Sequence, residues 1–155
     1  MEIRLATVDH CADLARLHAR CFEELWDPDT FWTLLQQPNT FALLANETHE
    51  EEARGFVVLR IAADESEILT LGIAPEYRCR GMASKLVLEA AELANSKGAT
   101  HLFLEVGLDN SAATKLYRTL GFEQVGVRQR YYQRPGAPAE DACILRAGLP
   151  LALSA

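Results

Sequence analysis

The central stretch of the chain, residues 66–92, constrains the fold more than any other. It predicts an apolar strand over 67–73, which Pro75 ends because proline cannot donate to a β-ladder. A basic turn containing Gly81 follows, and then a helix is predicted over 84–97. Apolar residues recur at helical spacing on one face of that helix, namely Met82, Leu86, Ala90, Leu93 and Ala94. The stretch therefore predicts a strand–turn–helix unit at the centre of the fold.

The turn between this strand and helix is suited to an anion. A helix that begins on Gly81 and small Ala83 presents unpaired N–H groups that no large side chain covers. Arg78 and Arg80 add positive charge, so a diphosphate is the expected ligand. The alternative is a turn that needs glycine for packing alone. Cys79 is either a thiol made reactive by the two arginines or a bystander on an exposed turn, and we favour the bystander.

Length and composition indicate one globular domain over residues 1–155. The chain has 155 residues, 49% of them hydrophobic and 24% charged, which is enough for a single core. No segment approaches the ~20 apolar residues of a membrane span, and the first residues predict a strand rather than a signal peptide, so we expect a cytoplasmic protein. The four cysteines lack metal-site spacing, so neither zinc nor disulfide bonds are indicated. A net charge of −7 argues against nucleic acid and favours cationic substrates.

The remaining pattern predicts a mixed α/β domain. Strands are expected over 2–6, 40–45, 55–62, 101–106, 122–132 and 143–149, and helices end near residues 22, 36 and 120. A helix separates the strands 67–73 and 101–106, so these two should be parallel. Gly72 lies inside a predicted strand, where a glycine marks either a bulge or a place where a ligand comes close to the backbone.

The motif Arg78-x-x-Gly81-x-Ala83 after a strand resembles the acetyl-CoA signature of the GCN5-related N-acetyltransferases (GNAT superfamily). The likeness extends over residues 2–149, and it is greatest to the bacterial ribosomal-protein alanine N-acetyltransferases. The supporting segments are Phe22-Glu23-Glu24-Leu25-Trp26, Leu104-Glu105-Val106, Asp109-Asn110-Ser111-Ala112-Ala113, Leu116-Tyr117, Leu120-Gly121-Phe122, Arg130-Tyr131-Tyr132 and Glu140-Asp141-Ala142. The resemblance implies a mostly antiparallel sheet with a central splayed parallel strand pair and flanking helices.

The resemblance also implies acetyl-CoA as cosubstrate and no metal. Leu71, Gly72 and Ile73 would pair with its pantetheine arm. The pyrophosphate would be bound by the turn, through Arg78, Cys79, Arg80, Gly81, Met82, Ala83 and Ser84. Asn110 would contact the pantetheine arm, and it also suits a helix cap.

Amine acetylation needs a neutral amine and a proton donor for the departing CoA thiolate. By resemblance, Glu105 is the general base, acting through water, and an apolar strand end would raise its pKa. Tyr117 is by the same resemblance the general acid. From the residues alone, Glu105 also fits a solvent-facing strand position and Tyr117 an aromatic core residue.

The acceptor implied by the resemblance is the N-terminal α-amino group of a protein, a ribosomal protein with N-terminal alanine in particular. Trp26, Tyr131 and Tyr132 would line its cleft, although aromatic residues near Trp26 also suit a core. His18 is expected to be a packed residue rather than a ligand. Two alternatives remain open: acetylation of a small-molecule amine or antibiotic, and a non-catalytic acyl-CoA-binding sensor module. We expect a monomer or weak dimer that binds neither nucleic acid nor membrane.

Overall fold

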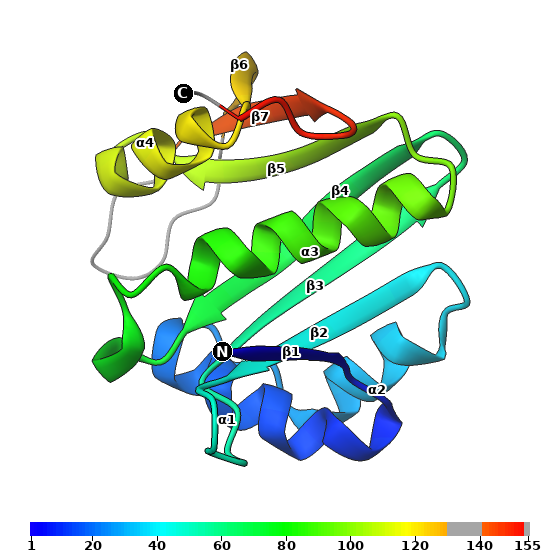
Figure 1. Cartoon of the computed structure of the whole chain (residues 1–155), viewed down its shortest axis with the longest axis vertical. Helices are drawn as coiled ribbons and strands as arrows, with labels where there is room; N and C mark the ends of the chain where they lie inside the picture. The colour runs from blue at the N-terminus through cyan, green and yellow to red at the C-terminus, as the bar shows by residue number, and fades with distance from the viewer. Residues whose placement is uncertain (130–140, 154–155) are drawn as a thin grey trace.

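A seven-stranded sheet in the order β1-β2-β3-β4-β5-β7-β6 forms the centre of the molecule (Figure 1). The structure is a computed structural model that describes residues 1–129 and 141–153. Its strands are β1 (Glu2–Leu5), β2 (Thr40–Asn46), β3 (Gly55–Ala62), β4 (Glu65–Ile73), β5 (His101–Gly107), β6 (Glu123–Arg128) and β7 (Ala142–Gly148). Its helices are α1 (Cys11–Cys21), α2 (Pro28–Gln36), α3 (Met82–Ser96) and α4 (Ser111–Thr119), with 3₁₀ turns η1 (Val8–His10) and η2 (Pro75–Tyr77).

Strand pairing confirms the predicted fold class. β4 and β5 are parallel, and every other neighbouring pair of strands is antiparallel, including the predicted β2–β3 hairpin. α3 begins at Met82, two residues before the predicted start, because Gly81 already serves as its N-cap in the left-handed conformation. β6 ends at Arg128, so the predicted strand 122–132 is too long by at least Gln129, and residues 130–132 lie outside the described part of the chain.

Polar side chains fix the starts of three helical segments, one of which begins at the predicted cap residue Asn110. Thr7 and His10 form a capping box at η1, which leads directly into α1. Asp27 accepts a hydrogen bond from the Thr30 N–H at the start of α2. Asn110 caps α4 by accepting from the Ala113 N–H. Within the described residues no helix has the length and apolar character needed to cross a membrane.

The helices cover both faces of the sheet. α1 and α2 lie on one face and α3 and α4 on the other (Figure 1). Under α1 and α2, the core contains Leu14, Leu17, Phe31, Ala42, Leu44, Phe56 and Val58. The opposite face carries two clusters, one of which joins α3 to β2 and β3 through Met82, Leu86, Ala90, Ala94, Leu43, Ala45, Val57 and Leu59. The other joins α4 to β5 and β7 and includes Leu102, Leu104, Val106, Tyr117, Leu120, Phe122 and Leu145.

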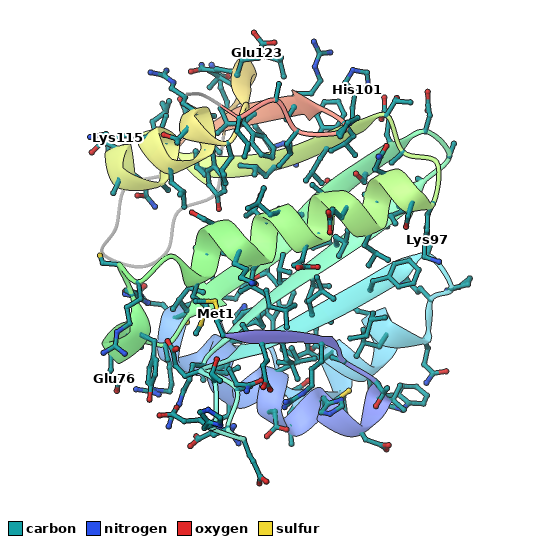
Figure 2. The ribbon with its side chains drawn as sticks, in the orientation of Figure 1. Met1, Glu76, Lys97, His101, Lys115 and Glu123 are labelled. Carbon is teal, nitrogen blue, oxygen red and sulfur yellow. The ribbon has the colours of Figure 1, made fainter. Side chains whose placement is uncertain are left out.

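The parallel strands β4 and β5 separate along their length. Only Glu65–Glu67 pair with His101–Phe103, at the start of both strands. Figure 1 shows the two strands diverging toward their carboxyl ends, where α4 and the turn before α3 lie. Glu76 and Lys115 mark that open edge in Figure 2, whereas Lys97 and His101 mark the paired edge. The splayed central pair implied by the resemblance is therefore present.

Gly72 lies in the separated part of β4 and is buried between two elements. A Cβ atom at this position would lie 2.8 Å from Phe56 Cε1 and 2.9 Å from Cys21 Sγ. Both distances are shorter than van der Waals contact, so the C-terminal turn of α1 rests directly on the β4 backbone. The close packing of α1 therefore explains why residue 72 is a glycine. This explanation is separate from the two that the sequence offers, which are a bulge and a ligand close to the backbone.

We expect Gly72→Ala to lower the free energy of unfolding by about 1–3 kcal/mol, because the added methyl group overpacks the contact with Phe56 and Cys21. Gly148→Ala is the matched control, since no atom lies within 4 Å of a Cβ there, and it should change stability by less than about 0.5 kcal/mol. Urea denaturation of both variants measures the difference. Equal stability of the two would show that α1 does not press on β4.

Candidate active site

In the part of the chain that the structure describes, the separated part of β4 has no strand partner on the side that faces β5. The Ala74 N–H donates to the Arg54 carbonyl on the β3 side at 2.7 Å. Because peptide groups alternate along a strand, those of Gly72 also face β3, and those of Leu71 and Ile73 face the gap. The Ile73 carbonyl accepts from Arg78 Nε at 3.0 Å and from Cys21 Sγ at 3.4 Å. Burial raises the pKa of the Cys21 thiol, which keeps it a neutral donor.

The turn after β4 presents backbone donors at the start of α3. Gly81 has φ 84°, and no side chain caps the helix there. No atom lies within 4 Å of a Cβ built at Gly81, so the space in front of the helix is open. Among the described residues, no acceptor is found for the N–H groups of Met82, Ala83 and Ser84. This geometry is that of a helix N-terminus suited to an anion.

Two of the predicted phosphate-binding residues are arginines anchored beside this turn. Arg78 is held by its bond to the Ile73 carbonyl. The Arg80 guanidinium lies 4.9 Å from the centre of the Tyr77 ring, and the Arg54 guanidinium lies 4.7 Å from it. The Tyr77 hydroxyl in turn donates to Glu50 Oε2 at 3.2 Å. Cation–π contacts thus place Arg80 at the helix N-terminus, and no pattern in the sequence predicts this role of Tyr77.

Cys79 lies exposed at the same turn, with φ 62° and a free thiol. Its side chain is in the position expected of a bystander, and the role of this thiol stays a prediction. Within residues 1–129 and 141–153, no group of three or more His, Cys, Asp or Glu side chains is arranged to hold a metal ion.

Glu105 lies in the separated part of β5 and faces away from α3 and α4. Its neighbours Leu104 and Val106 are buried in the cluster under α4, so alternation directs Glu105 to the opposite face. There its side chain, 29% exposed, lines a cavity of about 550 Å³. Leu69, Phe103, Arg128 and Ile144 also line the cavity. Arg128 Nε lies 2.8 Å from Glu105 Oε1.

Tyr117 projects from α4 into the core on the other face of the sheet. It is 7% exposed, and its ring meets Phe122 edge to face with centroids 5.7 Å apart. Leu71 of β4 packs against the same cluster. Burial raises the pKa of the Tyr117 phenol, and no hydrogen-bond partner of its hydroxyl is found in the described chain. Glu105 and Tyr117 therefore approach the separated strands from opposite faces.

The aromatic residues near the end of α1 divide between core and surface. His18 is 3% exposed and stacks on Trp26 with centroids 4.8 Å apart, which confirms that it is a packed residue. Burial lowers the pKa of its imidazole. Phe31 is fully buried, Trp32 is exposed, and Trp26 is half-buried. Trp26 can therefore pack on the core and still present one side to a ligand.

The roles of some predicted site residues remain predictions. Tyr131 and Tyr132 lie outside the described residues. Asn110 is a helix cap, and its contact with the pantetheine arm is untested. The sequence analysis did not predict the Arg128–Glu105 ion pair. Gly126 lies inside the predicted strand 122–132, where a glycine can mark a bulge, and a bulge there changes the face of the sheet on which Arg128 lies.

Comparison with known proteins identifies the family. Residues 11–122 match the acetyltransferase (GNAT) family. The chain is 32% identical over 144 residues to a provisionally named ribosomal protein bS18-alanine N-acetyltransferase of Bacillus subtilis, covering 92% of this chain and 90% of that protein.

Solved structures agree in fold. The ribosomal-protein-S18-alanine N-acetyltransferase from Escherichia coli superimposes with a TM-score of 0.85 at 22% identity, over 97% of this chain and 95% of that one. NAA60 from Arabidopsis thaliana, crystallised with acetyl-CoA, gives a TM-score of 0.82 at 20% identity, over 96% and 98%. Together with the splayed strands and the uncapped start of α3, these findings establish that the chain belongs to the acetyltransferase (GNAT) family and is an N-acetyltransferase with acetyl-CoA as its acetyl donor.

Proposed function

We propose that this N-acetyltransferase modifies the N-terminal α-amino group of a protein, with an N-terminal alanine of a ribosomal protein as the expected acceptor. The observation that carries the chemistry is the gap between β4 and β5, which Glu105 approaches from one face and Tyr117 from the other. The choice of acceptor is supported by the name of the Bacillus subtilis relative, which the chain matches over most of its length. The cytoplasmic location stays a prediction.

The residues of the open edge fit acetyl-CoA. The uncapped start of α3 with its open approach suits the pyrophosphate, and Arg78 and Arg80 supply matching charge. Leu71 and Ile73 turn their peptide groups toward the gap, where the amides of a pantetheine arm would find partners. When bound, acetyl-CoA supplies an electrophilic thioester at the gap.

Glu105 and Tyr117 divide the proton transfers. Glu105 accepts a proton from the acceptor ammonium through water, which frees the nitrogen lone pair for attack. Tyr117 gives its proton to the departing thiolate. Its raised pKa keeps the phenol protonated at neutral pH, as a general acid must be. Direct transfer between the two substrates needs no nucleophile from the chain.

We expect Gly81→Asp to weaken CoA binding at least about 100-fold, because the carboxylate would repel the pyrophosphate at close range. Gly98→Asp is the matched control, since Gly98 also has a positive φ, 99°, and no atom within 4 Å of a Cβ, but lies at the other end of α3. Isothermal titration calorimetry compares the two. Similar CoA affinities would mean that the turn does not bind the phosphates.

We expect Glu105→Gln and Tyr117→Phe to lower kcat by on the order of 100-fold to 10,000-fold, while acetyl-CoA affinity changes little. Because burial raises the pKa of Tyr117, any loss of rate caused by its ionisation should begin only above about pH 10, the usual value for tyrosine. Rates across pH with saturating acetyl-CoA measure both effects. Wild-type kcat in both variants would make these residues structural and would favour a binding module.

We expect the wild type to prefer an Ala-starting peptide over a Leu-starting one by about 10-fold or more in kcat/KM, since a narrow apolar pocket discriminates by side-chain size. Trp26→Leu should reduce this ratio if Trp26 lines the pocket, while exposed Trp32→Leu should leave it unchanged. Mass spectrometry of acetylated peptides gives the rates, and circular dichroism checks the fold. A preference for spermidine over every peptide would contradict a protein acceptor and leave the acetyltransferase activity standing.

A further inference from the structure

The proposed general base is engaged by an arginine from a distant part of the chain. Arg128, the last residue of β6, places Nε 2.8 Å from Glu105 Oε1. Both side chains line the same cavity, beside the separated ends of β4 and β5. The guanidinium thus occupies one carboxylate oxygen at the position where a base would meet the acceptor's ammonium group.

A β-bulge in β6 brings Arg128 to this face of the sheet. Gln124 pairs with Leu145, but Gly126 pairs with Ile144, so Val125 is an extra residue. Ile144 lines the cavity, and Leu145 is buried in the cluster under α4. Without the extra residue, alternation would direct Arg128 to the α4 side, because a one-residue shift exchanges the two faces of a strand. The bulge therefore accounts for the contact between Arg128 and Glu105.

The two members of the ion pair differ in exposure. The Arg128 side chain is 65% exposed and that of Glu105 is 29% exposed. A pair with one partner this open to water typically changes an equilibrium by less than about fivefold. Arg128 can therefore move into solvent at little cost, whereas Glu105 stays in place on β5.

The signs of the other charged groups near Glu105 are compatible with binding of a further cation. Among the described residues, the other charged groups that line the cavity are Arg60 of β3, Glu65 and Glu67 of β4 and Arg128 of β6. Arg146 of β7 pairs with Phe103, which also lines the cavity, so it lies on the same face of the sheet. Arg60 is already paired with Glu67. Without Arg128, the described charged groups on this face carry a net negative charge, which favours an ammonium group.

We propose that Arg128 is a positioning residue that holds the Glu105 carboxylate in its orientation, and that the acceptor's α-ammonium group displaces Arg128 on binding. This inference rests on the proposed function and names the contact of the base that the acceptor replaces. The ammonium then gives one proton through water to the Glu105 carboxylate, and its nitrogen keeps the lone pair for attack. Arg128 keeps its own proton throughout, because guanidinium is not deprotonated in proteins.

The test compares peptide binding with and without the competing cation. Calorimetry of the CoA-loaded protein should show that Arg128→Gln binds an Ala-starting peptide about two- to fivefold more tightly than wild type. Arg128→Lys should restore wild-type affinity, because it keeps the charge. Arg16→Gln, which breaks an Arg–Asp pair of 2.9 Å on α1 outside the cavity, should have no effect.

Two further experiments distinguish displacement of Arg128 by the acceptor from a purely structural role of Arg128. A des-amino peptide, with propionyl in place of alanine, has no ammonium, so its affinity should be the same in wild type and Arg128→Gln. In a Glu105→Gln background, Arg128→Gln should no longer change the affinity for the Ala-starting peptide. Unchanged or weaker binding of that peptide by Arg128→Gln, or an equal gain for the des-amino peptide, would overturn the inference. Failure of the proposed function would appear separately, as absence of peptide acetylation by the wild type.

Discussion

The early end of pairing between β4 and β5 is the constraint on which the rest of the structure depends. Backbone groups left without a strand partner must find other partners, and the Ile73 carbonyl finds Arg78 and Cys21. The strands stay apart because each is fixed to different elements. Gly72 of β4 lies under α1 and Phe56, whereas Leu104 and Val106 of β5 belong to the cluster under α4. The gap is thus a result of core packing on both faces.

The charged groups beside the gap matter more for binding than the net charge of the chain. The chain carries −7 overall, yet arginines lie on both sides of the gap, with Arg78 and Arg80 just after β4 and Arg128 beside Glu105 of β5. Arg80 is held on the Tyr77 ring and Arg78 on a backbone carbonyl, so both remain beside the start of α3. Arg128 instead meets a carboxylate and is largely exposed. An anchored cation suits a ligand that is always anionic, whereas a weakly held cation suits a site that must receive another cation.

The sequence predicted most of the fold because its signals are local. Pro75, Gly81 and the apolar spacing after Gly81 define the strand–turn–helix unit, and the cap residue Asn110 marks the start of α4. The separation of β4 and β5 came only from family resemblance, because no periodicity encodes where two strands stop pairing. The Arg128–Glu105 contact escaped prediction because it joins strands that are distant in the chain, and a single bulge decides which face Arg128 takes.

The two halves of the proposed site depend on sequence in different ways. On the donor side the candidate contacts are mainly peptide groups, at Leu71, Ile73 and the first turn of α3, and many side chains are compatible with them. The Escherichia coli structure shares this fold with a TM-score of 0.85 at only 22% identity, as expected where backbone geometry is what must be kept. On the acceptor side the candidate contacts are side chains, Trp26 and Arg128 among them. Substitutions there would change the choice of amine without disturbing the strands that hold the donor, so a single fold can serve many acceptors.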